Sequence, residues 1–274
     1  MSGARADGAP GGVRQLRVCM DRIPAWRGHR LEWVESTGST NGDLNVAGDM
    51  RLLVAGHQTA GRGQRGRTWT AAPGAGLLFS FTWIWPDVDT AWEIPIRTGL
   101  SVRSALLPFA EAEDRIWLKW PNDICLDDGK LGGILVESTL REDGLHLVIG
   151  IGINLRDPGR LDDDEPGTRM RPAALDECGE SARAADRWTV LGAFVRSWAD
   201  QMDLARSGGE ALRAAYVEAA RPFWGRNVRI ALGDGEIVEG RAMSLAARGA
   251  LEILEKNGGH RLVTDARRLF LVGE

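Results

Sequence analysis

Gly61-Arg62-Gly63-Gln64-Arg65-Gly66-Arg67-Thr68-Trp69 places three arginines among three glycines within nine residues. Like charges this close together repel one another unless an anion lies between them. Glycine lets the main chain approach a ligand closely and point N–H groups at it, and arginine offers a planar pair of donors to a carboxylate or phosphate. This glycine–arginine loop, residues 61–69, therefore predicts a site that encloses an anionic small molecule.

The glycine spacing also fits Gly-x-Gly-x-x-Gly, the pattern of dinucleotide sites and protein kinases. The Rossmann form requires a helix directly after the last glycine. Here Pro73-Gly74 soon interrupts the chain, and no helical apolar period follows the loop. The kinase form requires a catalytic loop and an Asp-Phe-Gly motif, which this sequence lacks. The prediction therefore rests on the arginines more than on the glycine spacing.

Composition is that of a globular protein with a sizeable core. The 274 residues accommodate one large domain and a small one, and the net charge of −4 predicts no general contact with nucleic acid. The three cysteines and four histidines are scattered and form no C-x-x-C pattern, so neither a disulfide framework nor a zinc site is favoured. With no apolar run of membrane-spanning length and no secretory signal, we expect a cytoplasmic protein without a membrane partner.

Apolar patterning predicts a sheet flanked by helices and then a small all-β unit. We expect strands at 31–35, 51–56, 76–85, 116–120, 132–138 and 145–154, and helices at 94–112, 188–201 and 210–220. The acidic segment 157–186 reads as a long surface excursion. After Pro222, closely spaced short strands with glycine turns predict a small β-barrel. The expected organisation is a flexible arm over 1–27, a catalytic domain over 28–221 and the barrel over 222–274.

Four polar clusters lie at strand ends or turns, where binding sites are usually built. They are Ser39-Thr40-Asn41, the glycine–arginine loop, Lys119-Trp120-Pro121-Asn122-Asp123 and Lys130-Leu131-Gly132-Gly133. Each has a purely structural alternative. Ser39 or Thr40 could cap a helix, Asp123 could form an Asx-turn, and Lys130 could be a solvated turn residue. Trp69 and Trp120 could be core aromatics.

Taken together and in this order, the clusters resemble the biotin–protein ligase family over roughly residues 36–154 and the C-terminal barrel. The resemblance rests on the glycine–arginine loop, Lys119–Asp123, Lys130–Ile134 and Gly150-Ile151-Gly152-Ile153-Asn154. It implies an α+β fold. A mixed sheet flanked by helices, like the class II aminoacyl-tRNA synthetase catalytic domain, is followed by an SH3-like barrel.

The resemblance implies a two-step reaction. Biotin and ATP, with Mg²⁺, form biotinyl-5′-AMP and pyrophosphate, and the biotinyl group then passes to one lysine of the biotin carboxyl carrier domain of an acyl-CoA carboxylase. It assigns no protein ligand to Mg²⁺. It leaves open whether the chain is a monomer or a homodimer.

The resemblance also implies roles for individual residues. Biotin is expected to contact Ser39, Thr40, Asn41, Gln58, Arg62, Gly63, Gln64, Lys130, Gly132, Gly133 and Gly152. ATP is expected to contact Arg65, Arg67, Trp69, Asn122, Lys130 and Asn154. Lys130, Arg65 and Arg67 are the expected catalytic cations, because joining two anions requires positive charge. Asp123 is the expected proton acceptor for the incoming lysine, although it could equally hold Lys130 or Mg²⁺.

One residue departs from the family pattern, since many relatives carry arginine where this chain has Gln64. Glutamine keeps hydrogen bonding but loses the charge, which predicts a leakier biotinyl-AMP intermediate. The loop has little apolar surface to hold it, so we also expect it to be mobile without ligand and to fold over biotinyl-AMP.

Three other functions compete with this interpretation. A lipoate–protein ligase makes an analogous acyl-adenylate but is not expected to combine this loop with Lys-Trp-Pro-Asn-Asp. A repressor requires a DNA-binding domain, and the short, Gly/Pro-interrupted stretch before residue 30 does not fit one, so no DNA partner is expected. A non-enzymatic biotin-binding module has no use for so many phosphate-directed arginines.

Overall fold

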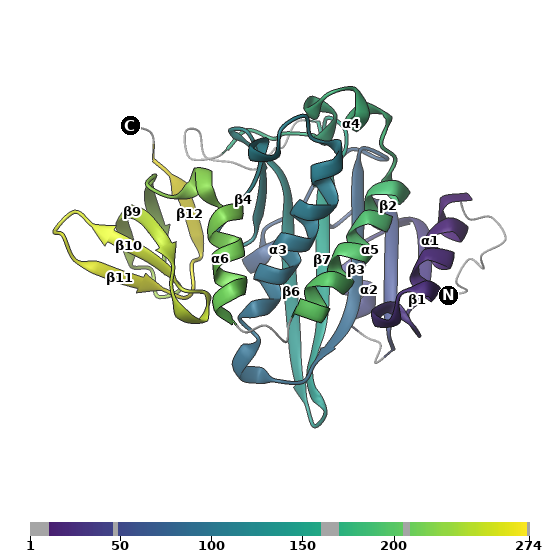
Figure 1. Cartoon of the computed structure of the whole chain (residues 1–274), viewed down its shortest axis with the longest axis horizontal. Helices are drawn as coiled ribbons and strands as arrows, with labels where there is room; N and C mark the ends of the chain where they lie inside the picture. The colour runs from purple at the N-terminus through teal and green to yellow at the C-terminus, as the bar shows by residue number, and fades with distance from the viewer. Residues whose placement is uncertain (1–10, 46–48, 160–169, 205–208, 273–274) are drawn as a thin grey trace.

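The computed structural model describes residues 11–45, 49–159, 170–204 and 209–272, and these residues form two sheets and a layer of helices (Figure 1). The larger sheet has seven strands in the order β1-β2-β3-β7-β6-β5-β4. Its strands are β1 (Arg30–Thr37), β2 (Arg51–Gln58), β3 (Gly76–Trp85), β4 (Ile116–Lys119), β5 (Asp123–Leu126), β6 (Gly129–Arg141) and β7 (Gly144–Asn154). The β1–β2 pair is parallel and the other pairs are antiparallel. The predicted mixed sheet is confirmed.

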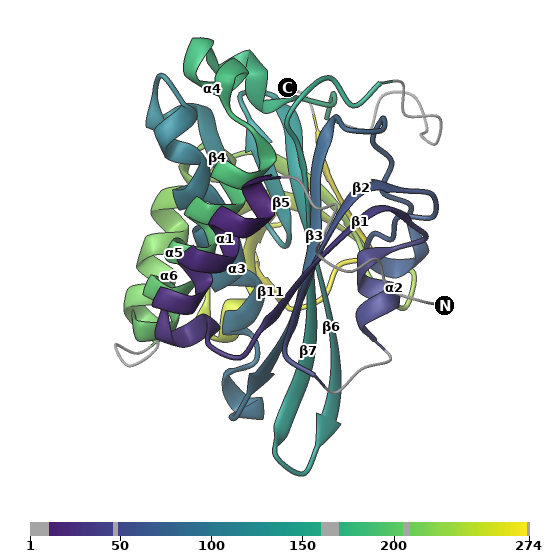
Figure 2. The ribbon, with the colours of Figure 1, turned by 90° about the vertical axis from the view of Figure 1, so that its right-hand side faces the viewer.

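Helices cover both faces of this sheet, unequally (Figure 2). The thicker layer contains α3 (Glu93–Leu106), α5 (Arg187–Asp203) and α6 (Gly209–Ala219), whereas the short α2 (Thr40–Leu44) lies on the opposite face. Strand β3 shows how the sequence separates the two faces, because neighbouring side chains on a strand point in opposite directions. Phe79 and Phe81 pack against Phe194 of α5, at ring centroid distances of 5.0 and 5.7 Å. Ser80, between them, contacts α2.

The C-terminal unit is a five-stranded antiparallel sheet in the order β11-β10-β9-β8-β12. Its strands are β8 (Asn227–Ala231), β9 (Ile237–Leu245), β10 (Leu251–Glu255), β11 (His260–Val263) and β12 (Arg268–Leu271). The predicted small all-β unit after the catalytic sheet is confirmed. Its contacts with the larger unit include a hydrogen bond from Trp120 Nε1 to the Gly249 carbonyl at 3.0 Å and the ion pairs Arg65–Asp265 and Asp89–Arg248.

The start of the chain differs from the expected flexible arm. Gly11–Arg22 form helix α1, which buries Leu16 and Met20 against α5, and Trp26 beyond it is also buried. The flanking glycines and Pro24 masked this helix, although Leu16 and Met20 stand four residues apart, as on one helix face. The expectation of an arm is therefore wrong from Gly11 onward, and residues 1–10 lie outside the described residues.

Three further expectations need correction. The helix predicted over 94–112 ends at Leu106, because Pro108 lacks the N–H that would continue it. The stretch between the strands expected at 116–120 and 132–138, for which no element was predicted, contains strand β5. The segment 157–186, expected to be a surface excursion, packs against the core in its described part. It contains η7 (Leu175–Cys178) and α4 (Glu180–Ala184), which bury Leu175, Cys178 and Ala182. Residues 160–169 lie outside the description. Among the helices that the structure describes, none combines the length and apolar character of a membrane span.

Candidate active site

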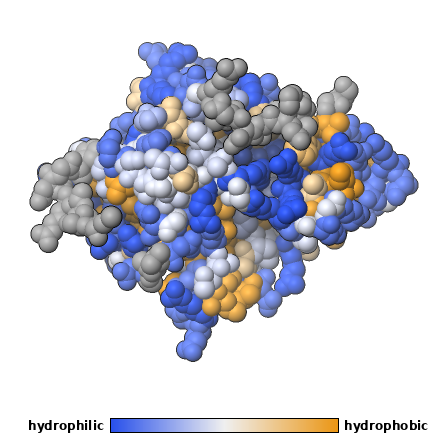
Figure 3. Space-filling model, turned by 180° about the vertical axis from the view of Figure 1, so that it is seen from behind, coloured by the Kyte–Doolittle hydropathy of each residue, from blue (hydrophilic) through white to orange (hydrophobic). Residues whose placement is uncertain are grey.

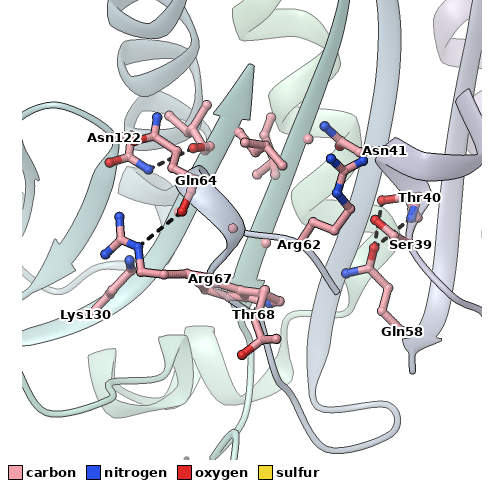
Figure 4. A pocket seen from close by; sticks show the side chains of 18 residues that line it. Ser39, Thr40, Asn41, Gln58, Arg62, Gln64, Arg67, Thr68, Asn122 and Lys130 are labelled. Carbon is pink, nitrogen blue, oxygen red and sulfur yellow. Dashed lines mark hydrogen bonds between the residues drawn. The ribbon is translucent and has the colours of Figure 1, made fainter. Parts of the chain in front are cut away.

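A pocket lies on the sheet face that carries α2, between this helix, the glycine–arginine loop and strands β6 and β7 (Figure 4). Most of its predicted residues line it: Ser39, Thr40, Asn41, Gln58, Arg62, Gly63, Gln64, Arg67, Trp69, Asn122, Lys130, Gly133 and Gly152. The remaining lining residues are Thr68, Ile134, Leu135, Gly150 and Ile151. Figure 4 shows Ser39, Thr40 and Gln58 at one end of the pocket and Asn122, Arg67 and Lys130 at the other.

The first end is a neutral slot formed by Ser39, Thr40, Asn41, Gln58 and Ser80. Gln58, at the end of β2, accepts hydrogen bonds through Oε1 from the Thr40 backbone N–H at 2.8 Å and from the Thr40 hydroxyl at 3.0 Å. Ser80 Oγ lies 2.6 Å from both Thr40 Oγ1 and Asn41 Oδ1. Ser39 stands at the N-cap of α2 but makes no side-chain capping bond. The slot thus presents fixed, uncharged donors and acceptors.

Glu137 of β6 connects the slot to the loop. Its Oε2 accepts hydrogen bonds from Asn41 Nδ2 at 2.9 Å and Asn45 Nδ2 at 3.1 Å, and its Oε1 lies 2.9 Å from Arg62 Nη2. The sequence analysis missed this residue because it follows the Lys130–Ile134 block and reads as an ordinary polar strand residue. Its placement three residues beyond Ile134 of that block is the one signal that could have found it.

The glycine–arginine loop is a tight hairpin. The Trp69 N–H donates to the Gly61 carbonyl at 2.9 Å, and the Gly63 N–H donates to the Arg67 carbonyl at 2.7 Å. Arg65 turns the chain with a φ of 59°, in the left-handed region. The Arg65 side chain points away from the pocket, toward Asp265 of the C-terminal unit. The loop therefore offers Arg62 and Arg67 to the pocket and Arg65 to a neighbouring groove.

That groove runs between the loop, Trp120-Pro121, strand β6 and residues 264–266. Seen from behind, the surface here is hydrophilic and hollowed beside the C-terminal sheet (Figure 3). The groove and the pocket share Arg62, Gly63, Gln64, Arg67, Thr68 and Leu135. The loop is thus the wall between the two hollows.

At two positions of the sheet, neighbouring side chains pack so closely that only glycine fits. A Cβ on Gly152 would lie 2.5 Å from Cε2 of Trp69, and a Cβ on Gly150 would collide with Asn41 Oδ1. Trp69 lies across Gly152 and also near Gly133, at 3.3 Å from its ideal Cβ position. The Trp69 indole N–H is buried and has no hydrogen-bond partner among the described residues. A ligand with an acceptor at this point would satisfy it.

At the other end of the pocket, one carboxylate is shared by two lysines. Asp123 Oδ1 lies 2.5 Å from Lys130 Nζ, and Asp123 Oδ2 lies 2.6 Å from Lys119 Nζ. Burial alone would raise the pKa of Asp123, but the charges and hydrogen bonds of Lys119 and Lys130 outweigh it and hold the pKa well below its ordinary value. Asp123 is therefore an ionised counter-ion to the lysines. The sequence analysis treated Lys119 only as part of its block.

Four predicted site residues do not line the pocket. Arg65 contacts Asp265, and Asp123 lies behind Lys130. Gly132 faces the Gly152 carbonyl, which lies 2.7 Å from its ideal Cβ position. The amide of Asn154 donates to the Ala173 carbonyl at 3.0 Å, and its Oδ1 is buried without a partner among the described residues. Within the described ranges, no cluster of three or more His, Cys, Asp or Glu side chains could hold a metal ion.

Comparisons with known proteins agree with this geometry. Residues 33–154 match the biotin/lipoate A/B protein ligase family. The chain is 32% identical to the biotin–[acetyl-CoA-carboxylase] ligase of Mycobacterium tuberculosis, over 88% of each protein. It is 33% identical to the bifunctional ligase/repressor BirA of Escherichia coli, over 75% of this chain and 61% of that protein.

The fold has the same relatives. A structure of the biotin protein ligase from Aquifex aeolicus in complex with biotin and ATP superimposes with a TM-score of 0.73 at 27% identity, over 89% of this chain and 99% of that one. The chain therefore belongs to the biotin–protein ligase family.

Proposed function

We propose that this protein attaches biotin to a lysine of a biotin carboxyl carrier domain through biotinyl-5′-AMP, with release of pyrophosphate. The observation that carries the proposal is the division of one pocket into a neutral slot and a cationic end. Biotin has the same division, because its ureido ring is neutral and its valeryl tail ends in a carboxylate.

The slot matches the ureido ring in hydrogen-bonding capacity. The ring has two N–H donors and one carbonyl acceptor, and the slot contains hydroxyls, which both donate and accept, and amides. The Thr40, Gln58 and Ser80 side chains are already fixed by one another, so little side-chain entropy is lost on binding. Gly150 and Gly152 let Asn41 and Trp69 lie directly on the sheet, where these side chains would border the bicyclic ring.

The cationic end supplies what adenylate formation needs. In that step the biotin carboxylate attacks the α-phosphorus of ATP, and the bond to pyrophosphate breaks. Both reactants are anions, so Lys130 and Arg67, which line the pocket, would offset their repulsion and the charge that builds on the phosphate. Arg62 would act from the slot side. Arg65 would join them by exchanging Asp265 for phosphate oxygens.

The role of Asp123 follows from its partners. A carboxylate held ionised by two lysines is a weak base, so we propose that it positions Lys130 and does not accept the proton of the incoming amine. Mg²⁺ would enter with ATP, coordinated mainly by phosphate oxygens and water, as is usual for nucleotide sites.

The direct test is pyrophosphate exchange. The full-length protein should catalyse ATP–pyrophosphate exchange only when biotin is present. It should also increase the mass of a purified carrier domain by one biotinyl group when incubated with biotin and Mg-ATP. Exchange that proceeds equally without biotin would contradict the proposal.

A lipoate ligase is the second candidate, because the matching family includes both activities. The dithiolane ring of lipoate has no N–H or C=O group. The donors and acceptors that the slot side chains do not use among themselves would then lose water without gaining a partner, which is unfavourable. Substituting lipoate for biotin in the exchange assay separates the two, and we expect biotin to be preferred by at least about 100-fold in kcat/KM.

A further inference from the structure

The chain uses lysine very sparingly. Lys119, Lys130 and Lys256 are its three lysines, against 31 arginines. Two of these three contact the same carboxylate, Asp123. The third, Lys256, is exposed in the C-terminal unit and pairs with Glu239 at 3.0 Å. The protein uses arginine for most of its positive charge and places two of its three lysines together at one buried point.

The stereochemistry of the two cations explains this choice. A guanidinium fork tends to cover both oxygens of one carboxylate, whereas an ammonium contacts one. Lys119 takes Oδ2 of Asp123 and Lys130 takes Oδ1, so two lysines share a carboxylate that one arginine could occupy. The strand pairing sets this up, because Lys119 of β4 lies directly opposite Asp123 of β5.

The two lysines differ in what they can reach. Lys130 lines the pocket, with its ammonium 5.8 Å from the centre of the Trp69 ring. Lys119 is buried and does not line the pocket. Nearby Cys125 and Tyr216 are uncharged near neutrality, since burial raises the pKa of both groups. Asp123, Lys119 and Lys130 thus form a group of one anion and two cations, and of the two cations only Lys130 can contact a ligand.

We propose that Lys119 is a positioning residue that keeps Asp123 paired when Lys130 turns to the anionic substrate. This inference rests on the function proposed above. Without Lys119, movement of Lys130 toward a phosphate would leave a buried carboxylate without a cation, which is strongly unfavourable. With Lys119 present, Asp123 keeps a partner in both positions of Lys130. Lys119 therefore leaves Lys130 free to contact the anionic substrate.

Two ligands separate this role from a general effect on folding. Biotinamide, in which an uncharged amide replaces the carboxylate of biotin, tests the neutral slot. Biotinol-5′-AMP, the stable phosphodiester analogue of the intermediate, tests the slot and the cationic end together. Isothermal titration of the full-length protein with each ligand needs no turnover, so inactive variants remain informative. In Lys119→Met we expect the Kd for biotinamide to stay within about twofold and the Kd for the analogue to rise about 10- to 100-fold.

The dependence on Asp123 is the decisive comparison. In an Asp123→Asn background there is no buried carboxylate to leave unpaired, so adding Lys119→Met should change the Kd for the analogue by less than about threefold. Lys256→Met removes a lysine from an ordinary exposed ion pair and should change neither Kd. If Lys119→Met does not fold, Lys119→Gln gives the same test, because it still donates to Asp123 but carries no charge.

The outcomes are distinct. The inference is overturned if Lys119→Met binds the analogue as the wild type does, if it weakens binding of biotinamide and of the analogue equally, or if the loss is the same with and without Asp123. A wild-type protein that binds neither ligand would instead overturn the proposed function.

Discussion

The Nη2 atom of Arg62 lies 2.9 Å from Oε1 of Glu137, so an ion pair ties the glycine–arginine loop to strand β6. The other oxygen of the same carboxylate accepts from Asn41 in the slot. Any ligand that contacts Asn41 therefore acts on a group that also holds the loop.

Glu137→Gln tests this connection. The amide keeps one acceptor but loses the charge that strengthens the bonds to Arg62 and Asn41, so we expect biotin affinity to fall about 3- to 10-fold. Titration calorimetry measures this affinity. Glu32→Gln is a matched control, because Glu32 has the same 24% side-chain exposure and pairs with Arg51 outside the pocket. Unchanged affinity in Glu137→Gln would show that the contact is incidental.

Limited proteolysis can test whether the glycine–arginine loop closes over the ligands. Trypsin cuts after arginine, and we expect biotin plus ATP to slow cleavage at Arg62, Arg65 and Arg67 by at least about fivefold, because the loop folds over the intermediate. Cleavage at exposed Arg248, which precedes Gly249 and lies outside the pocket, serves as the internal reference and should keep its rate. Equal cleavage of the loop with and without ligands would argue against closure.

Gln64 is expected to weaken retention of biotinyl-AMP, since it lines the pocket without a charge. We predict that Gln64→Arg slows release of the intermediate by about 10-fold, the typical worth of one charge-assisted hydrogen bond. Released intermediate acylates exposed amines, so biotin on Lys256, whose side chain is 82% exposed, reports the leak by mass spectrometry. Gln15→Arg on the exposed face of α1 makes the same substitution elsewhere and should leave the release rate as it is. An unaltered rate in Gln64→Arg would refute the prediction.

The Arg65–Asp265 pair is the contact between the loop and the C-terminal unit. Partly exposed ion pairs contribute about 0–1 kcal/mol, so phosphate can displace Asp265 at little cost. Asp265→Asn should lower the KM for ATP, by no more than about fivefold. Asp89→Asn removes a comparable exposed pair with Arg248 and should not change it. A KM that rises in Asp265→Asn would mean that the pair orders Arg65 for catalysis.

Burial of Cys125 predicts a loss of stability in alkali. Burial raises the pKa of this thiol from 9.0 to about 12. As pH rises above about 9, the unfolded thiol ionises while the folded one stays protonated, so the free energy of unfolding falls, by at most about 1.4 kcal/mol per pH unit from this group. Urea unfolding between pH 8 and 10.5 should show a shallower decline in Cys125→Ala than in the wild type. Cys19→Ala, at a half-exposed thiol, should retain the wild-type slope.

Much of the catalytic sheet could be predicted because its strands are long apolar runs with clear ends. β3 has the bounds expected from Gly76 to Trp85, and β7 extends the expected strand by one residue. Strand β5 was not foreseen, since Pro121 and the Asp127–Gly129 turn flank only four residues. Helix α1 was missed because short glycine-flanked helices depend on tertiary packing, here on α5, more than on propensity.

The same reasoning applies to the residues of the site. Residues in compact blocks, such as Lys130 and Gln64, could be assigned because their types and order were informative. Glu137 could not, because its importance arises from three contacts made across elements distant in sequence. The amide of Asn154 donates to the Ala173 carbonyl, and this residue does not line the pocket, so its expected nucleotide contact stays a prediction.

The scarcity of lysine also has a practical side. Lys256 is the one well-exposed lysine, and it lies in the turn between β10 and β11, remote in sequence from every pocket-lining residue. Amine chemistry at this position would attach a dye or a solid support to the side chain of a single residue. Molecules coupled to a sensor surface through this side chain would share one point of attachment, outside the residues that line the pocket.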